Sequence, residues 1–134
     1  MVEYKGIEKV DAQALSDQRS LTEALWLALQ RQGVKNRTPR RVECFFIARA
    51  DSAVASLLNA FPETGEWNRD VSRIDDTPDT ISVKIISPLV HLTREALLEL
   101  VDVMMIAADE SGCVFDGFQV DLSDLKQRPW WKFW

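Results

Sequence analysis

Arg41-Val-Glu-Cys-Phe-Phe-Ile-Ala-Arg49 is the stretch that decides the fold. Its β-branched and aromatic residues lie between two charged ends, a pattern typical of a β-strand. Because side chains alternate along a strand, Cys44 and Phe46 point to one face, and Phe45 and Ile47 point to the other. Both faces carry apolar side chains, so the sequence predicts that each face of the sheet needs a cover.

The residues that follow this strand predict a helix and then a hairpin. Asp51 or Ser52 is expected to cap a short helix, whose apolar side consists of Val54, Leu57, Leu58 and Phe61. Residues 67–74 and 81–87 read as two strands, and residues 75–79 between them read as a turn. The second strand is the more apolar of the two.

Two longer helices complete the pattern. Thr93 is expected to cap the longest helix, which ends at Gly112 and leads into a last strand over residues 113–120. Upstream, Ser20-Leu-Thr-Glu23 forms a capping box, which predicts a helix from Ser20 to Gly33. Residues 1–19 are mostly polar and are interpreted as an N-terminal arm of uncertain order.

Two strand-helix-strand units that each cross over right-handed predict an α+β fold. It is a ferredoxin-like four-stranded antiparallel sheet (βαββαβ) with the helices on one face, preceded by an extra N-terminal helix. The second face of the sheet needs another cover. The candidates within the chain are the first helix and the tail, residues 123–134.

Charge and composition limit the function. The 134-residue chain carries a net charge of −5. Lys126, Arg128 and Lys132 contribute +3 at its end, so the part before Lys126 carries −8. Such acidity disfavours binding to nucleic acid. No signal peptide or apolar membrane span is visible, and two cysteines are too few for a disulfide framework. A cytoplasmic protein is expected.

The sequence contains none of the standard catalytic motifs. One histidine, His91, and two separated cysteines are too few for a typical zinc site. The nucleophile elbow, the phosphate-binding glycine loop and the zinc-protease helix motif are all missing. We therefore expect no enzyme, no cofactor and no metal. Asp109 and Glu110, at the end of the longest helix, oppose the helix dipole and are interpreted as a solvated end or a contact surface.

Four features resemble the ribonuclease E inhibitor B family, the RraB-like proteins. They are the helix that ends near Gly33, the strand around Phe45, the helix over residues 97–108, and Phe115-Asp-Gly-Phe118, which is similar to the family's aromatic-Asp-Gly-aromatic motif. The resemblance covers residues 21–122 and implies the same α+β fold, binding to ribonuclease E, and inhibition of RNA cleavage. It places an RraB-like domain at residues 20–122. The basic tail departs from the long acidic tail of the characterised member.

The sequence therefore predicts a non-catalytic, protein-binding regulator whose partner is ribonuclease E or a related RNA-processing enzyme. The predicted contact residues are Phe45, Ile47, Phe115, Asp116, Gly117 and Phe118, with Trp130, Trp131 and Trp134 as a secondary contact. Gly117 marks a bulge or a close backbone approach. A ferredoxin-like small-molecule sensor and a dimeric binding module stay open as alternatives, and so does a homodimer.

The tail has three interpretations, because clustered Trp side chains are rarely left without a use. The rings cover the second sheet face, or they dock on a partner or a second copy, or they insert at a membrane surface.

Overall fold

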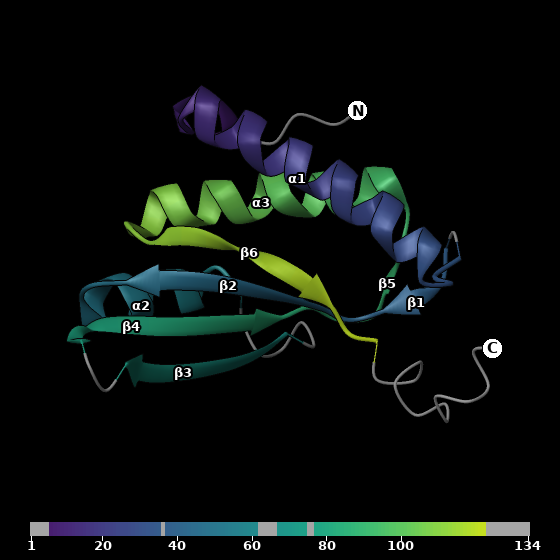
Figure 1. The fold of residues 1–134 in the computed structure, drawn as a ribbon. Helices are drawn as coiled ribbons and strands as arrows, with labels where there is room; N and C mark the ends of the chain where they lie inside the picture. Colours follow the sequence, from purple (N-terminus) through teal and green to yellow (C-terminus); the bar gives the residue numbers. More distant parts are fainter. Residues whose placement is uncertain (1–5, 36, 62–66, 75–76, 123–134) are drawn as a thin grey trace.

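The computed structural model describes residues 6–35, 37–61, 67–74 and 77–122. Figure 1 shows the helices and strands of the chain. They are η1 (Ile7–Lys9), α1 (Ala12–Arg31), β1 (Pro39–Arg40), β2 (Val42–Ala48), α2 (Asp51–Asn59), β3 (Asn68–Ile74), β4 (Thr77–Ile86), β5 (Val90–His91), α3 (Arg94–Ser111) and β6 (Val114–Val120).

The main sheet has the strand order β3-β4-β2-β6, and each neighbouring pair is antiparallel. Helices α2 and α3 pack on one face, and α1 precedes the sheet (Figure 1). The predicted ferredoxin-like α+β arrangement is therefore confirmed. A second, two-stranded pairing of β1 with β5 was not predicted, because each of its strands is only two residues long.

The core lies between the sheet and the helices. Cys44 and Phe46 of β2 are fully buried on this covered face, whereas Phe45 and Ile47 are half-buried on the second face. The alternation expected from the sequence is confirmed. The Phe46 ring packs against that of Phe115 on β6, with ring centroids 5.3 Å apart, so β2 and β6 share one aromatic contact inside the core.

Helix α1 begins at Ala12 and not at Ser20, so the predicted start is wrong. The carboxylate of Asp11 accepts the backbone N–H of Ala14 at 2.8 Å and caps the helix about two and a half turns earlier than Ser20 would. Glu23, the second member of the expected capping box, pairs with Arg94 of α3 instead. Residues 12–19 of the predicted arm are thus helical.

Helix α1 packs beside α3 and not on the second sheet face (Figure 1). The buried residues of α1 are Thr22, Trp26 and Leu29. The Arg19 guanidinium donates to both carboxylate oxygens of Asp102 on α3, at 3.0 and 2.7 Å, and this hydrogen bonding raises the pKa of Arg19. Because the Asp102 residue is only 3% exposed, this ion pair anchors α1 to α3. The idea that the first helix covers the second face is wrong.

The remaining boundaries differ by small amounts. Thr93 caps α3 by accepting the N–H of Ala96 at 3.0 Å, and Gly112 ends the helix at φ +79°, both as predicted. Helix α2 starts at Asp51, but Ala50 occupies the cap position and no side chain caps it. Strands β3 and β4 form the predicted hairpin, and β4 begins inside the stretch expected to be a turn.

Candidate protein-binding groove

Strand β6 contains a bulge at the predicted position. Gly117 lies opposite Phe45 of β2, and Phe115 lies opposite Phe46, so Asp116 is an extra residue without a partner in the register. Gly117 has a φ of +105°, and a Cβ built on it would meet nothing within 4 Å. The backbone conformation, rather than tight packing, therefore requires glycine here.

Strand β6 is also an edge strand. It pairs with β2 on one side, and its other side pairs with no strand in the described part of the chain. Helix α1 lies beyond this free edge, beside α3 (Figure 1). Since α1 is held by α3 and not by the sheet, a hollow remains between α1 and β6.

Three adjoining hollows follow β6 from its first residue to its end. Their volumes are about 370, 230 and 230 Å³; Gln18 lines the first and second, and Leu25 lines the second and third. We call them together the α1–β6 groove. Its walls are Val10, Asp11, Ala14, Asp17, Gln18, Leu21, Leu25, Leu29 and Gln32 from α1 and its approach, Met105, Ala108 and Asp109 from α3, residues 113–122, and Glu43 of β2.

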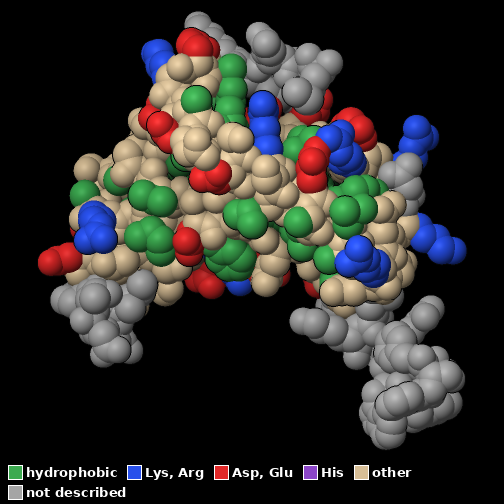
Figure 2. All heavy atoms as spheres, turned by 45° about the horizontal axis from the view of Figure 1, so that its top comes forward, with side chains coloured by type: hydrophobic (Ala, Val, Ile, Leu, Met, Phe, Trp, Pro, Cys, Tyr) green, Lys and Arg blue, Asp and Glu red, His purple; other side chains and the backbone are tan. Residues whose placement is uncertain are grey.

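The groove is acidic. Six lining residues are Asp or Glu, and among the described residues that line it there is no Lys or Arg. The four carboxylates that form no ion pair with a described residue are Asp11, Asp17, Asp109 and Asp116. Figure 2, turned so that α1 comes forward, shows hydrophobic side chains in patches with Asp and Glu side chains among them.

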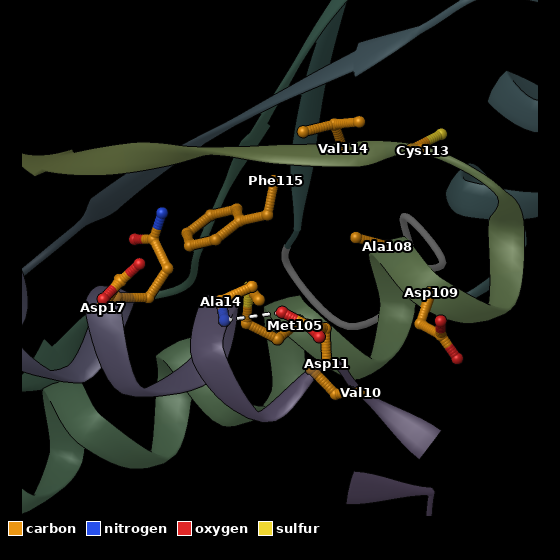
Figure 3. Close-up of a pocket in the computed structure, with 11 residues that line it drawn as sticks. Val10, Asp11, Ala14, Asp17, Met105, Ala108, Asp109, Cys113, Val114 and Phe115 are labelled. Atoms are coloured by element: carbon orange, nitrogen blue, oxygen red, sulfur yellow. Dashed lines mark hydrogen bonds between the residues drawn. The ribbon is translucent and has the colours of Figure 1, made fainter.

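The groove also exposes apolar side chains. Leu21 of α1 is 63% exposed and Val114 of β6 is 64% exposed, and both are among the most exposed large hydrophobic residues of the described chain. Figure 3 shows the Phe115 ring pointing from β6 toward α1, on the opposite side of the strand from Val114. An occupant of this groove would therefore meet apolar surface and negative charge together.

The structure divides the predicted contact residues into two groups. Phe115, Asp116, Gly117 and Phe118 line the α1–β6 groove. Phe45 and Ile47 lie on the second face of the sheet, because β2 alternates and its neighbours Cys44 and Phe46 point into the core. The predicted tail contacts, Trp130, Trp131 and Trp134, lie outside the described residues.

The second face carries its own charge pairs. Lys84 of β4 forms an ion pair with Glu43 of β2 at 3.2 Å, and Gln119 of β6 donates to the same carboxylate at 3.4 Å. Asp70 of β3 lies opposite Lys84 in the register. Phe45, whose register partner is Lys84, therefore lies beside an ion pair that is already formed.

The Cys44 thiol and the possible metal ligands can be located in the described residues. Burial raises the pKa of the Cys44 thiol from an ordinary value of 9.0 to about 12, so this thiol stays protonated and unreactive. In the described ranges no three His, Cys, Asp or Glu side chains are placed to hold a metal ion. Of the basic residues before β2, Arg40 is buried and donates to the carbonyl of Asp121 at 3.1 Å, which gives it a structural role.

Sequence reasoning missed the α1 side of the groove. Asp11 and Asp17 lie in the stretch interpreted as an arm. The signal that would have revealed this part of the helix is Asp11 itself, a capping residue whose carboxylate accepts the N–H of Ala14 three positions later. Asp109 was singled out in the sequence, and it lines the groove at an exposed position near the end of α3.

None of the described helices is long and apolar enough to span a membrane. No protein-family model matches the sequence, and no curated protein matches it.

Proposed function

We propose that this chain is a cytoplasmic, non-catalytic regulator that binds another protein, in the manner of the RraB-like inhibitors of ribonuclease E. A basic segment of the partner lies in the α1–β6 groove. One observation carries this proposal: the groove combines exposed apolar side chains with four carboxylates that have no cationic partner among the described residues.

The chemistry of the groove supports an extended peptide as the bound element. A peptide chain beside an edge strand can use the strand's free N–H and C=O groups, and neighbouring side chains then select its sequence. The free edge of β6 forms one wall of the groove, and Leu21 and Val114 supply apolar contact. Asp17 and Asp116 favour Lys or Arg in the peptide.

An RNA-processing enzyme supplies a partner of matching charge. Enzymes that hold RNA do so with basic surfaces that neutralise phosphates. An acidic groove can bind such a basic surface and compete with RNA for it. The predicted partner, ribonuclease E or a related enzyme, is therefore consistent with the charge of the groove, whereas direct RNA binding by this chain is disfavoured.

The test is cleavage of a fluorescent single-stranded RNA by purified ribonuclease E in the presence of the full chain. We expect the native chain to slow cleavage and to bind the enzyme directly. The double variant Asp17→Lys/Asp116→Lys, which places cations in the groove, should weaken binding by about tenfold or more. The affinity of the native chain should fall as salt is raised, because the charges are exposed.

Asp79→Lys is the matched control. Asp79 is an exposed carboxylate of β4, and β2 separates β4 from β6, so this change alters the net charge without touching the groove. It should leave inhibition unchanged. If Asp79→Lys weakens inhibition as much as a groove substitution does, the effect comes from total charge and the groove is not the site. If the native chain neither binds ribonuclease E nor slows it, the proposed function is wrong.

A further inference from the structure

We infer that the α1–β6 groove has an occupant encoded in this same chain: the basic, aromatic segment of residues 126–134. The inference rests on the proposed function only in taking the groove as a site for a peptide. The inference identifies this peptide as residues 126–134, and this segment then competes with any partner for the groove.

The segment matches the charge of the groove. Residues 126–134, KQRPWWKFW, carry three Lys or Arg and no Asp or Glu. The groove has the opposite character, with six acidic lining residues and no Lys or Arg among the described ones. Because Asp11, Asp17, Asp109 and Asp116 form no ion pair with a described residue, docking a cation here breaks no existing pair.

The segment also matches the apolar character of the groove. Four of its nine residues are Trp or Phe, and aromatic side chains provide much of the binding energy at protein interfaces. The groove presents the exposed Leu21 and Val114, together with the ring of Phe115 (Figure 3). Aromatic rings placed beside α1 would remove Leu21 from water and extend the apolar surface around Phe115, which is already buried.

The chain is long enough to reach. Leu122 lines the last hollow of the groove, so the chain leaves the described structure at one end of the site. A reversal of direction takes about four residues, as in a hairpin loop, and residues 127–134 in extended form then span about 27 Å. The seven residues of β6 span about 23 Å. Pro129 is compatible with this path, because an edge strand tolerates proline.

The experiment is ¹⁹F NMR on the full chain labelled with 5-fluorotryptophan. Replacing Trp130, Trp131 and Trp134 by Phe one at a time assigns their signals. We expect these signals to differ in shift from those of a free peptide of residues 126–134, and to be protected from a soluble paramagnetic agent. In Asp17→Lys/Asp116→Lys they should move to the free-peptide positions, whereas in Asp79→Lys they should not move. Signals at the free-peptide positions in the native chain would overturn the inference.

A second measurement tests occupancy by competition. A fluorescein-labelled peptide of residues 126–134 should bind the full-length triple variant Trp130→Ser/Trp131→Ser/Trp134→Ser at least tenfold more tightly than the native chain, since the native segment occupies the groove. Adding Asp17→Lys/Asp116→Lys to the triple variant should remove this binding. Equal affinity for the native chain and the triple variant would contradict occupancy.

Sedimentation distinguishes the chain's own segment from that of a second copy. We expect the native chain to stay monomeric while its Trp signals are protected. If the chain instead forms a dimer, and if dilution both dissociates the dimer and removes the protection of the Trp signals, docking within one chain is wrong. None of these measurements uses ribonuclease E, so protected signals without inhibition of the enzyme would refute the proposed function alone, and inhibition without protection would refute this inference alone.

Discussion

The second face of the sheet and the α1–β6 groove meet at Glu43, and both combine apolar and charged side chains, yet the pairing of their charges differs along them. On the second face, Glu43 and Lys84 pair across neighbouring strands at 3.2 Å. In the groove, Asp17 and Asp116 come from a helix and an edge strand, and they form no ion pair with a described residue. The groove thus presents carboxylates from two separate elements without a described cationic partner, whereas the second face holds a Glu–Lys pair between neighbouring strands.

Phe45 and Phe46 test this comparison most directly, because they are neighbours in β2 on opposite faces. Phe46→Ala removes a fully buried ring and should lower the free energy of unfolding by about 4 kcal/mol. Phe45→Ala removes a half-buried ring and should cost about 1 kcal/mol. Urea denaturation followed by circular dichroism measures both. Equal losses would mean that the second face is covered in solution, and the comparison would fail.

The ion pair between Arg19 and Asp102 tests whether α1 forms a fixed wall of the groove. Arg19→Ala leaves a buried carboxylate without its partner and should destabilise the protein by about 3 kcal/mol. Arg94→Ala, which breaks an exposed pair with Glu23 between the same two helices, should cost about 1 kcal/mol or less. If the two variants are equally stable in urea denaturation, α1 is held by its apolar contacts alone.

Gly117 tests whether the bulge shapes the edge of the groove. Gly117→Ala forces a residue with a Cβ to adopt φ +105° and should cost about 1 to 2 kcal/mol in thermal or urea unfolding. Gly117→Asn should cost less, since asparagine tolerates positive φ better than alanine. Because the space around a Cβ is open, an equal loss for both variants would point to crowding and not to backbone strain.

Cys44 reports how well water is excluded from the covered face. Its folded pKa is raised to about 12, so the thiol's contribution to stability is complete below pH 9 and is lost as the pH rises from 9 toward 12. In this window the native chain should lose up to about 1.4 kcal/mol per pH unit more than Cys44→Ala. Urea denaturation at a series of pH values measures the difference. Parallel curves for the two proteins would show that water reaches the thiol.

A thiol on the second face provides the contrast for Cys44. In a Cys113→Ala background, Cys44 should not react with a thiol reagent at pH 8 until the protein unfolds, because the thiolate is the reactive form. Ile47→Cys adds a thiol on the half-buried face of the same strand, and this one should react in the folded protein. Rapid reaction of Cys44 itself would remove the distinction between the two faces.

The sequence correctly predicted features that depend on a few neighbouring residues. The alternation of β2, the Thr93 cap and the Gly112 end of α3, and the bulge at Gly117 were all predicted from the sequence and confirmed. These features depend on a few neighbouring residues, and their backbone geometry is the same in many folds. The start of α1 was wrong because two capping signals compete, and the cap at Asp11 lies in a polar stretch without apolar periodicity.

Positions of elements relative to one another were decided only by the tertiary structure. The sequence by itself determined an antiparallel α+β sheet and the motif of residues 115–118. It did not determine that α1 packs beside α3, because the Arg19–Asp102 contact joins residues 83 positions apart. Together with the buried Trp26 and Leu29, that contact holds α1 beside α3, and Asp17 and Leu21 then line hollows along β6. A groove needs two walls, and residues distant in the chain supply them.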